Sequence, residues 1–83
     1  MAIVTLRYWA AAKDAAGVAD EKLEALTLAD ALAAAGDQRA RLRPVLARSS
    51  FLINGEPAGT RPPESIGLPD GAVIEVLPPF AGG

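Results

Sequence analysis

Regular alternation of apolar and polar residues marks both ends of the chain and constrains the fold more than any other feature. In AIVTLRYW (2–9) and AVIEVL (72–77), alternate apolar side chains fall on one face of an extended segment. A period of two is typical of a strand with one buried face. The residues predicted to face the core are Val4, Leu6, Tyr8, Ile74 and Val76.

One helix is clearly indicated between these strands. In TLADALAAAG (27–36), apolar residues recur at i, i+3, i+4 and i+7, Thr27 suits the N-cap, and Gly36 is predicted to end the helix. The other predicted elements are a short helix ended by Gly17, an edge strand at 20–26, a short irregular helical stretch around Pro44, a strand at 51–55 with an Asn54-Gly55 turn, and a loop at 56–71. One main helix and four short strands predict an α+β fold, a small sheet with the helix across one face.

The composition excludes several kinds of site. The chain has 83 residues, enough for one domain, and contains neither cysteine nor histidine. Disulfides, thiolate nucleophiles and most transition-metal and acid–base sites are therefore excluded, and we expect no metal site. The net charge of −2 argues against general binding to nucleic acid. No apolar run is long enough to span a membrane, and the N-terminus does not resemble a signal peptide, so we expect a cytoplasmic protein.

The sequence ends on LPPFAGG, a strand end followed by two prolines, an aromatic residue and a Gly-Gly pair. Pro78-Pro79 is stiff and ends the strand, because proline has no N–H for the sheet ladder. The residues from Pro78 onward reach at most about 20 Å. Gly82 lets the backbone thread a narrow channel, and Gly83 carries an unshielded carboxylate. We interpret this tail as a reactive arm whose chemistry comes from partner proteins; the alternative is a frayed terminus without function.

Three segments resemble a known family: LRYWAAAKDAAG (6–17), FLINGEP (51–57) and LPDGAVIEVLPPFAGG (68–83). In these segments and their spacing, essentially the whole chain resembles the MoaD/ThiS family of sulfur carriers, and most closely its molybdopterin synthase small subunits. The resemblance implies a ubiquitin-like β-grasp domain at 1–77 and an extended, flexible tail at 78–83. Trp9 stands where the family usually has phenylalanine, and Lys13 where it usually has arginine.

The resemblance also implies a reaction cycle at the C-terminus. An adenylating enzyme of the ubiquitin-activating type (MoeB-like) would activate the Gly83 carboxylate with ATP, and a sulfur donor would convert it to a thiocarboxylate. The tail, with Gly82 as its threading residue, would then enter a large catalytic subunit (MoaE-like) and deliver sulfur to a pyranopterin precursor of molybdopterin. We expect a heterotetramer of two carriers and two large subunits. ATP is used by the partner, so no bound cofactor is expected, and the chain is not an enzyme on its own.

The predicted docking surface lies where the first and last strands end. The resemblance implies that these strands are parallel neighbours, which places Trp9 and Leu77 beside the tail exit. By alternation both share a face with charged residues, so we expect them to face outward, although a secondary core under a loop is the alternative. Phe80 is expected either to anchor the tail in a partner or to lie back on the sheet. The predicted partner-binding residues are Trp9, Lys13, Leu77, Pro78, Pro79 and Phe80.

Other functions share this tail. A carrier that delivers sulfur to thiamin thiazole, cysteine or another thiolated metabolite would also end in Gly-Gly, although thiamin carriers are typically shorter. A ubiquitin-like modifier would use the same activation step and join Gly83 to a lysine through an amide. A β-grasp binding module without acyl chemistry would leave the tail unexplained.

Overall fold

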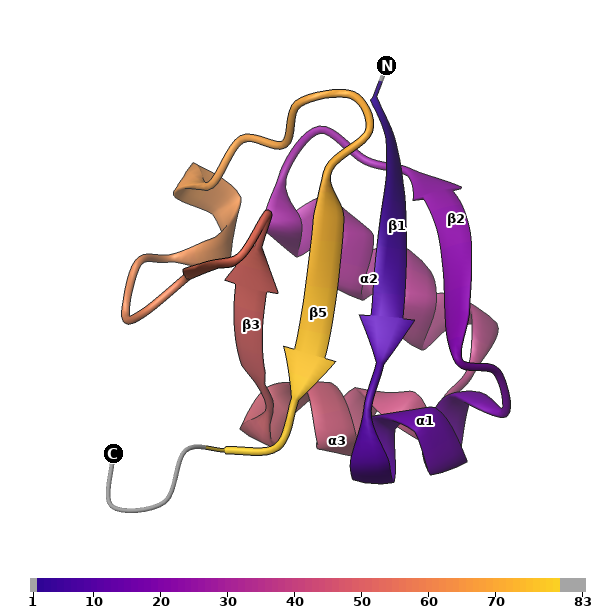
Figure 1. Cartoon of the computed structure of the whole chain (residues 1–83). Coiled ribbons are helices and arrows are strands. Elements are labelled where there is room, and N and C mark those ends of the chain that lie inside the picture. The colour runs from indigo at the N-terminus through magenta and orange to yellow at the C-terminus, as the bar shows by residue number, and fades with distance from the viewer. Residues whose placement is uncertain (1, 80–83) are drawn as a thin grey trace.

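The computed structural model describes residues 2–79, which form a mixed sheet with helices on one face and at one end (Figure 1). The elements in chain order are β1 (Ile3–Tyr8), α1 (Ala10–Ala16), β2 (Asp20–Glu24), α2 (Leu28–Gln38), α3 (Leu42–Arg48), β3 (Ser50–Ile53), β4 (Glu56–Pro57), a 3-10 turn (Pro63–Ser65) and β5 (Val73–Leu77). The α+β class and the ubiquitin-like β-grasp arrangement predicted from the sequence are confirmed.

The sheet has the strand order β2-β1-β5-β3-β4. The first and last strands, β1 and β5, are parallel neighbours, and every other pair in the described chain is antiparallel. Their register aligns Leu6 with Ile74 and Tyr8 with Val76. The parallel pairing and the edge position of β2 are as expected, whereas β4 is a fifth strand within the segment predicted to be loop.

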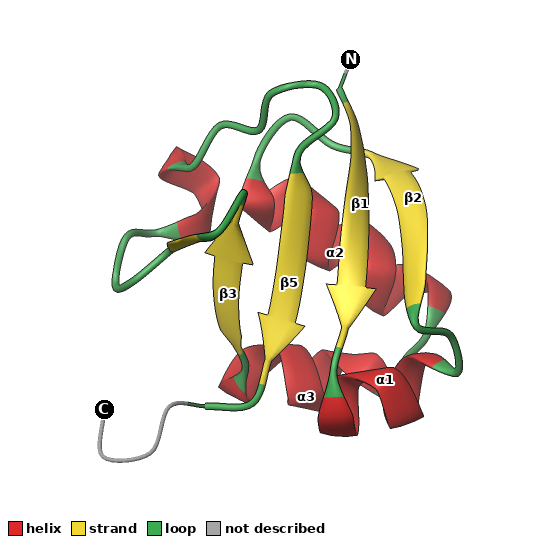
Figure 2. Ribbon diagram, in the orientation of Figure 1, coloured by secondary structure: helices red, strands yellow, loops and turns green. Residues whose placement is uncertain are grey.

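The core lies on the face of the sheet that α2 crosses (Figure 2). The inward residues of the two central strands are fully or almost fully buried, as the alternation predicted: Val4, Leu6, Tyr8, Ile74 and Val76. From α2, Leu28, Ala31 and Ala35 pack into the same cluster. No described helix covers the opposite face, which we call the outer face (Figure 1).

The predicted start of α2 is confirmed, whereas its predicted end is wrong. At the start, the Thr27 Oγ1 accepts a hydrogen bond from the Asp30 N–H at 3.2 Å, as expected of an N-cap. At the other end, the prediction that Gly36 stops the helix is wrong, since α2 continues to Gln38. A Cβ on Gly36 would lie 2.9 Å from Arg43 Cγ, and the Arg43 Nε donates to the Gly36 carbonyl at 3.2 Å. Gly36 therefore permits a close contact between α2 and α3.

The segment around Pro44 forms a regular helix, α3, and not the irregular stretch predicted. Pro44 lies in the first turn, where backbone N–H groups have no partner within the helix, so the missing N–H removes no helical hydrogen bond. Leu42 and Leu46 are buried in the core, and Val45 packs against it. Helix α3 thus closes the end of the sheet beside α1.

The predicted turn between β3 and β4 is confirmed. Asn54 and Gly55 have φ angles of 51° and 85°, as a tight hairpin turn requires. The Asn54 side-chain oxygen accepts a hydrogen bond from the Val73 N–H at 3.0 Å, which fixes the turn against the start of β5. The sequence identified the turn but not the two-residue strand that follows it.

One polar cluster lies at the edge of the helix-covered face. The Tyr8 hydroxyl donates to the Glu21 carboxylate at 2.7 Å, and Arg39 forms an ion pair with the same carboxylate. The cluster joins β1, β2 and the end of α2. Burial raises the pKa of the Tyr8 phenol, and the Glu21 hydrogen bond raises it further. The hydrogen bond to Glu21 likewise raises the pKa of Arg39.

Candidate functional site

The tail leaves the sheet at the end where β1 and β5 both finish. Because these strands are parallel, their carboxyl ends lie at the same edge of the sheet. The Trp9 N–H donates to the Val76 carbonyl at 3.1 Å, which continues the pairing one residue beyond β1. Trp9 is thereby held next to Leu77, the last residue of β5. In Figure 1 the chain leaves this edge near α3.

The side chain of Trp9 is exposed, as the alternation predicted. Trp9 retains 46% of its accessible surface, and its backbone is extended with φ −124° and ψ 151°. Ala10 follows with φ 50°, a left-handed conformation that is rare for a residue with a side chain. This sharp turn sends the chain directly from β1 into α1. Leu77 is half-buried on the outer face, so neither large apolar residue belongs to the buried core.

The remaining predicted site residues fall into three groups. Pro78 and Pro79 are exposed and follow β5 directly. Lys13 is exposed on α1, one turn after Trp9: its N–H donates to the Trp9 carbonyl at 3.4 Å, and the residue borders a separate hollow near Gly17. The other three predicted residues, Phe80, Gly82 and Gly83, lie outside the described residues.

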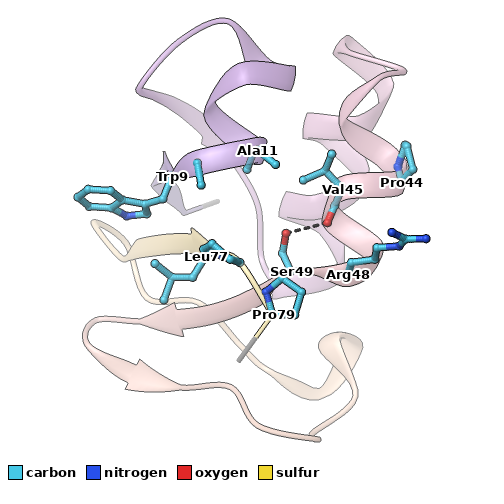
Figure 3. A pocket seen from close by; sticks show the side chains of 11 residues that line it. Trp9, Ala11, Pro44, Val45, Arg48, Ser49, Leu77 and Pro79 are labelled. Atoms are coloured by element: carbon cyan, nitrogen blue, oxygen red, sulfur yellow. Dashed lines mark hydrogen bonds between the residues drawn. The ribbon is translucent and has the colours of Figure 1, made fainter. Parts of the chain in front are cut away.

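A cavity of about 520 Å³ lies between α1, α3 and the start of the tail (Figure 3). We call it the tail-exit groove. Its described lining residues are Trp9, Ala10, Ala11, Ala12, Pro44, Val45, Arg48, Ser49, Leu77, Pro78 and Pro79. The sequence analysis did not assign the α3 residues to the site. Their spacing indicated a helix, but helical spacing alone does not show that α3 lies against the tail.

The polar groups of the tail-exit groove are few. The Ser49 hydroxyl is occupied, since it donates to the Val45 carbonyl at 2.7 Å. Arg48 is the only charged residue among the described lining residues, and it is exposed at the end of α3. In Figure 3, Arg48 and Trp9 lie at opposite ends of the groove, with Leu77 and Pro79 between them.

Few polar or charged side chains lie in the described part of the site. No cluster of three or more potential metal ligands occurs between residues 2 and 79. The partly exposed Tyr8–Glu21–Arg39 cluster lies at the edge of the helix-covered face and does not border the tail-exit groove. Of the helices in the described chain, none is both long and apolar enough to cross a membrane.

Comparison with models of known protein families shows which family the chain belongs to. The model of the ThiS family matches residues 6–83, nearly the whole chain including the Gly-Gly end. The chain belongs to the ThiS family. The resemblance to MoaD/ThiS sulfur carriers drawn from three sequence segments is thus confirmed. No curated protein sequence matches the chain significantly.

Solved structures agree with the family assignment. The chain is similar to the small archaeal modifier protein 1 from Methanosarcina acetivorans, with 26% identity, a TM-score of 0.83, and coverage of 100% of this chain and 98% of that one. It is also similar to a chain of the complex of subunits 1 and 2 of molybdopterin-converting factor from Helicobacter pylori, with 25% identity, a TM-score of 0.70, and coverage of 98% of this chain and 99% of that one. A putative molybdopterin converting factor subunit 1 from Pyrococcus furiosus, at 21% identity, a TM-score of 0.81 and coverage of 96% and 100%, shares the fold.

Proposed function

We propose that this ThiS-family chain carries sulfur on its C-terminus, as a thiocarboxylate of Gly83, for the synthesis of molybdopterin. The observation that carries the proposal is the family match, which extends to Gly83 and so includes the Gly-Gly end. The position of the tail supports it. The chain leaves the sheet beside the exposed Trp9, from an edge where two prolines direct it away from the ladder.

The proposed chemistry has two steps at one carbon atom. A carboxylate oxygen of Gly83 attacks the α-phosphorus of ATP, an oxygen–phosphorus bond forms, and pyrophosphate leaves. Hydrosulfide supplied by a sulfur donor then attacks the acyl carbon. The new carbon–sulfur bond replaces the bond to AMP, which leaves with the bonding electrons, and the sulfur releases its proton to solvent. Neither step changes an oxidation state, so no oxidant or reductant is needed.

This chain positions the Gly83 carboxylate for its partners and supplies no acid–base groups to the reaction. It has no histidine or cysteine, so ATP and the catalytic groups belong to a separate adenylating enzyme, and we propose no cofactor bound to the carrier. Trp9, Leu77 and the Pro78-Pro79 pair form the proposed docking patch, with Phe80 entering the partner and Gly82 threading its channel. Exposed aromatic residues at the centre of a contact are common anchors of binding energy.

We assign the molybdopterin pathway from the likeness to a chain of the Helicobacter pylori complex, in which subunits 1 and 2 of molybdopterin-converting factor are bound together. The corresponding partner here is a large catalytic subunit, in a heterotetramer of two carriers and two large subunits. Because activation consumes ATP, we place the cycle in the cytoplasm. Delivery to another thiolated metabolite is the alternative within the same chemistry.

A protein modifier is the second candidate function. It is favoured by the likeness to the small archaeal modifier protein 1, at 26% identity over the whole chain. In that case a lysine amine, and not hydrosulfide, would attack the activated Gly83 and form an amide. Gly83 found in amide linkage to lysines in cell extracts would support this function.

The test is the mass of the C-terminal peptide after incubation with ATP, a cognate adenylating enzyme and sulfide. Trypsin should release residues 49–83 as one peptide, because Arg61 precedes Pro62 and resists cleavage. A thiocarboxylate replaces oxygen by sulfur and adds about 16 Da, nearly the same mass as one sulfoxide oxygen on methionine. The only methionine is Met1, outside this peptide, so a gain in it cannot come from methionine oxidation.

We expect the gain of about 16 Da in this peptide, and no gain without ATP or in a chain that lacks Gly83. An unchanged peptide mass, with an adenylating enzyme that is demonstrably active, would contradict the carrier function. Whether the loaded protein then supports molybdopterin formation with the large subunit tests the pathway separately.

A further inference from the structure

We propose that the tail-exit groove and the adjoining face of α3 form one surface that binds an acidic segment of a partner protein, with carboxylates on both sides of apolar side chains. Arg41 and Arg48 supply the positive charge of this surface, and the apolar wall of the groove lies beside Arg48 (Figure 3). We call it the basic docking surface. It extends the docking patch around Trp9 and Leu77 onto a helix that the patch does not include.

Positive charge is concentrated in α3 and the turn before it. Residues 39–48 contain four of the eight lysine and arginine residues and no aspartate or glutamate, a charge of +4. The rest of the chain has four basic and ten acidic residues, a charge of −6, which accounts for the net charge of −2. An acidic segment is therefore attracted to this one end of the sheet and repelled by most of the remaining surface.

Two of these four arginines are engaged within the described chain, and two are not. Arg39 and Arg43 each form an ion pair with an acidic residue. The side chains of Arg41 and Arg48 form no hydrogen bond or ion pair among residues 2–79, and both residues are exposed. A guanidinium presents parallel N–H groups that match the two oxygens of a carboxylate, so each of the two can bind one acidic side chain.

The two unpaired arginines lie on one face of the helix. Arg41 has helical backbone angles, φ −66° and ψ −21°, and precedes Arg48 by seven residues, or two turns. Their Cα atoms are therefore about 10.5 Å apart along the helix axis. Pro44 and Val45 fall between them on the same face, and both line the groove. This face thus presents apolar residues between two cations.

The rest of the groove continues the apolar strip. Trp9, Ala11 and Leu77 form the remainder of the wall together with the prolines of the tail, and each of these residues is exposed or only half-buried. The cavity of about 520 Å³ has room for the apolar side chains of a short segment. A partner with acidic residues alone would leave this wall in contact with water. Apolar residues between the carboxylates are therefore part of the proposal.

A nucleic acid matches this surface less well than an acidic peptide. Proteins that bind nucleic acid through its backbone neutralise several phosphates, and their affinity depends on the number of such contacts. This surface offers two unpaired cations, and the charge of −6 in the rest of the chain repels a long polyanion. A short acidic segment can pair with both arginines and also cover the apolar wall.

One consequence rests on the proposed carrier function. Pro78 and Pro79 line the groove, so a partner that occupies the basic docking surface lies beside the start of the tail. An acidic segment of the adenylating enzyme or of the large subunit would be attracted to α3 before the apolar contacts with Trp9 form. The arginines would then raise the association rate, and the apolar wall would slow dissociation.

The test is a peptide titration of the full-length protein, followed by the fluorescence of Trp9, which is the only tryptophan. The probe is the hexapeptide Glu-Glu-Leu-Phe-Glu-Glu, acetylated and amidated so that only its side chains are charged. The neutral comparison peptide has glutamine in place of each glutamate. Two exposed ion pairs should make the acidic peptide bind about 2- to 30-fold more tightly than the neutral one at low salt. Added salt should reduce this preference.

Variants and nuclear magnetic resonance show where the peptide binds. Arg41→Gln/Arg48→Gln should bind the two peptides equally. The matched control is Arg7→Gln/Lys22→Gln, which removes the same charge from two exposed positions on the outer face and should retain the preference for the acidic peptide. With the wild type, the largest changes in amide shift should fall on residues 41–49.

Several results would overturn the proposal. These are equal affinity of the wild type for the two peptides, no detectable binding of either, and amide shifts confined to the outer face. An equal loss of preference in the control variant would make net charge the cause, and tighter binding of single-stranded hexauridylate would assign the surface to nucleic acid. None of these measurements uses ATP or an adenylating enzyme. Their failure therefore leaves the carrier function standing, and failure of thiocarboxylate formation leaves the basic docking surface standing.

Discussion

The two faces of one sheet differ although the same strands supply both. Ile74, on the face that α2 covers, is 0% exposed, whereas Ile3, on the outer face, is 43% exposed. No charged residue of the described chain is buried on the covered face. The buried Tyr8 places its hydroxyl at the edge of this face, where it meets the partly exposed Glu21. One face therefore holds the fold together, and the other is free to serve as a binding surface.

The outer face mixes apolar and charged residues in aligned rows. Arg7 of β1 lies opposite Glu75 of β5, which in turn lies opposite Leu52 of β3. Such mixed surfaces are common in protein interfaces that also exist exposed to water.

The largest effect should come from a matched pair of isoleucine substitutions. Ile74→Ala leaves a cavity in the core and should lower the free energy of unfolding by about 2–5 kcal/mol. Ile3→Ala removes the same atoms from the outer face and should change the free energy of unfolding by about 0.5 kcal/mol or less. Chemical denaturation of both variants measures the difference. Similar losses at the two positions would contradict the division between the faces.

The next largest effect should be on binding rather than stability. Trp9→Ala should weaken the affinity for the adenylating enzyme or the large subunit at least about 30-fold, if Trp9 anchors the docking patch. The melting temperature should change little, because the side chain is already half exposed. Leu26→Ala is the control, since Leu26 is 60% exposed and follows β2 at the opposite end of the sheet. Calorimetry measures the affinity of the wild type, Trp9→Ala and Leu26→Ala for the partner. Equal affinities of Trp9→Ala and the wild type would show that Trp9 is not part of the docking patch.

The covered face should also lose stability at alkaline pH. The unfolded phenol of Tyr8 releases its proton near pH 10, whereas burial and Glu21 hold the folded pKa higher. The unfolded state then binds fewer protons, so stability should fall above about pH 10, by up to about 1.4 kcal/mol per pH unit. Tyr8→Phe should remove this contribution to the decrease of stability with rising pH. Tyr8 is the only tyrosine, so tyrosinate absorbance reports it directly, and titration at the ordinary value in the folded protein would contradict the prediction.

The smallest effect concerns the contact between α2 and α3. Gly36→Ala gains about 1 kcal/mol of helix propensity but places a methyl group against Arg43 Cγ. We expect a net loss of at most about 1 kcal/mol in the wild-type background. In an Arg43→Ala background, the same change should stabilise by up to about 1 kcal/mol. Thermal unfolding of the four proteins tests this reversal of sign, and identical effects in both backgrounds would mean that the contact is not the reason for the glycine.

The sequence predicted the elements whose signal is local. The alternation in β1 and β5 identified the buried face, and the Thr27 cap and the Asn54-Gly55 turn are each set by a few neighbouring residues. The parallel pairing of β1 and β5 came from family resemblance, because strand order is not encoded in a local period. Those two sources together were enough to place Trp9 and Leu77 at one edge of the sheet.

The errors arose where a distant residue decides the local structure. Gly36 has the usual signature of a helix end, but the crossing of Arg43 explains why a glycine lies inside α2. β4 is only two residues long and exists through its pairing with β3. The wall of the tail-exit groove depends on α3 packing beside α1, which no spacing in the sequence reveals.

The most direct test of the account compares the full chain with one that lacks Gly83, in both folding stability and sulfur transfer. The account assigns the fold to the covered face and the chemistry to the terminus. It therefore predicts the same melting temperature for both proteins, and no thiocarboxylate or sulfur delivery from the shortened one. Sulfur delivery at the wild-type rate without Gly83 would contradict the central claim.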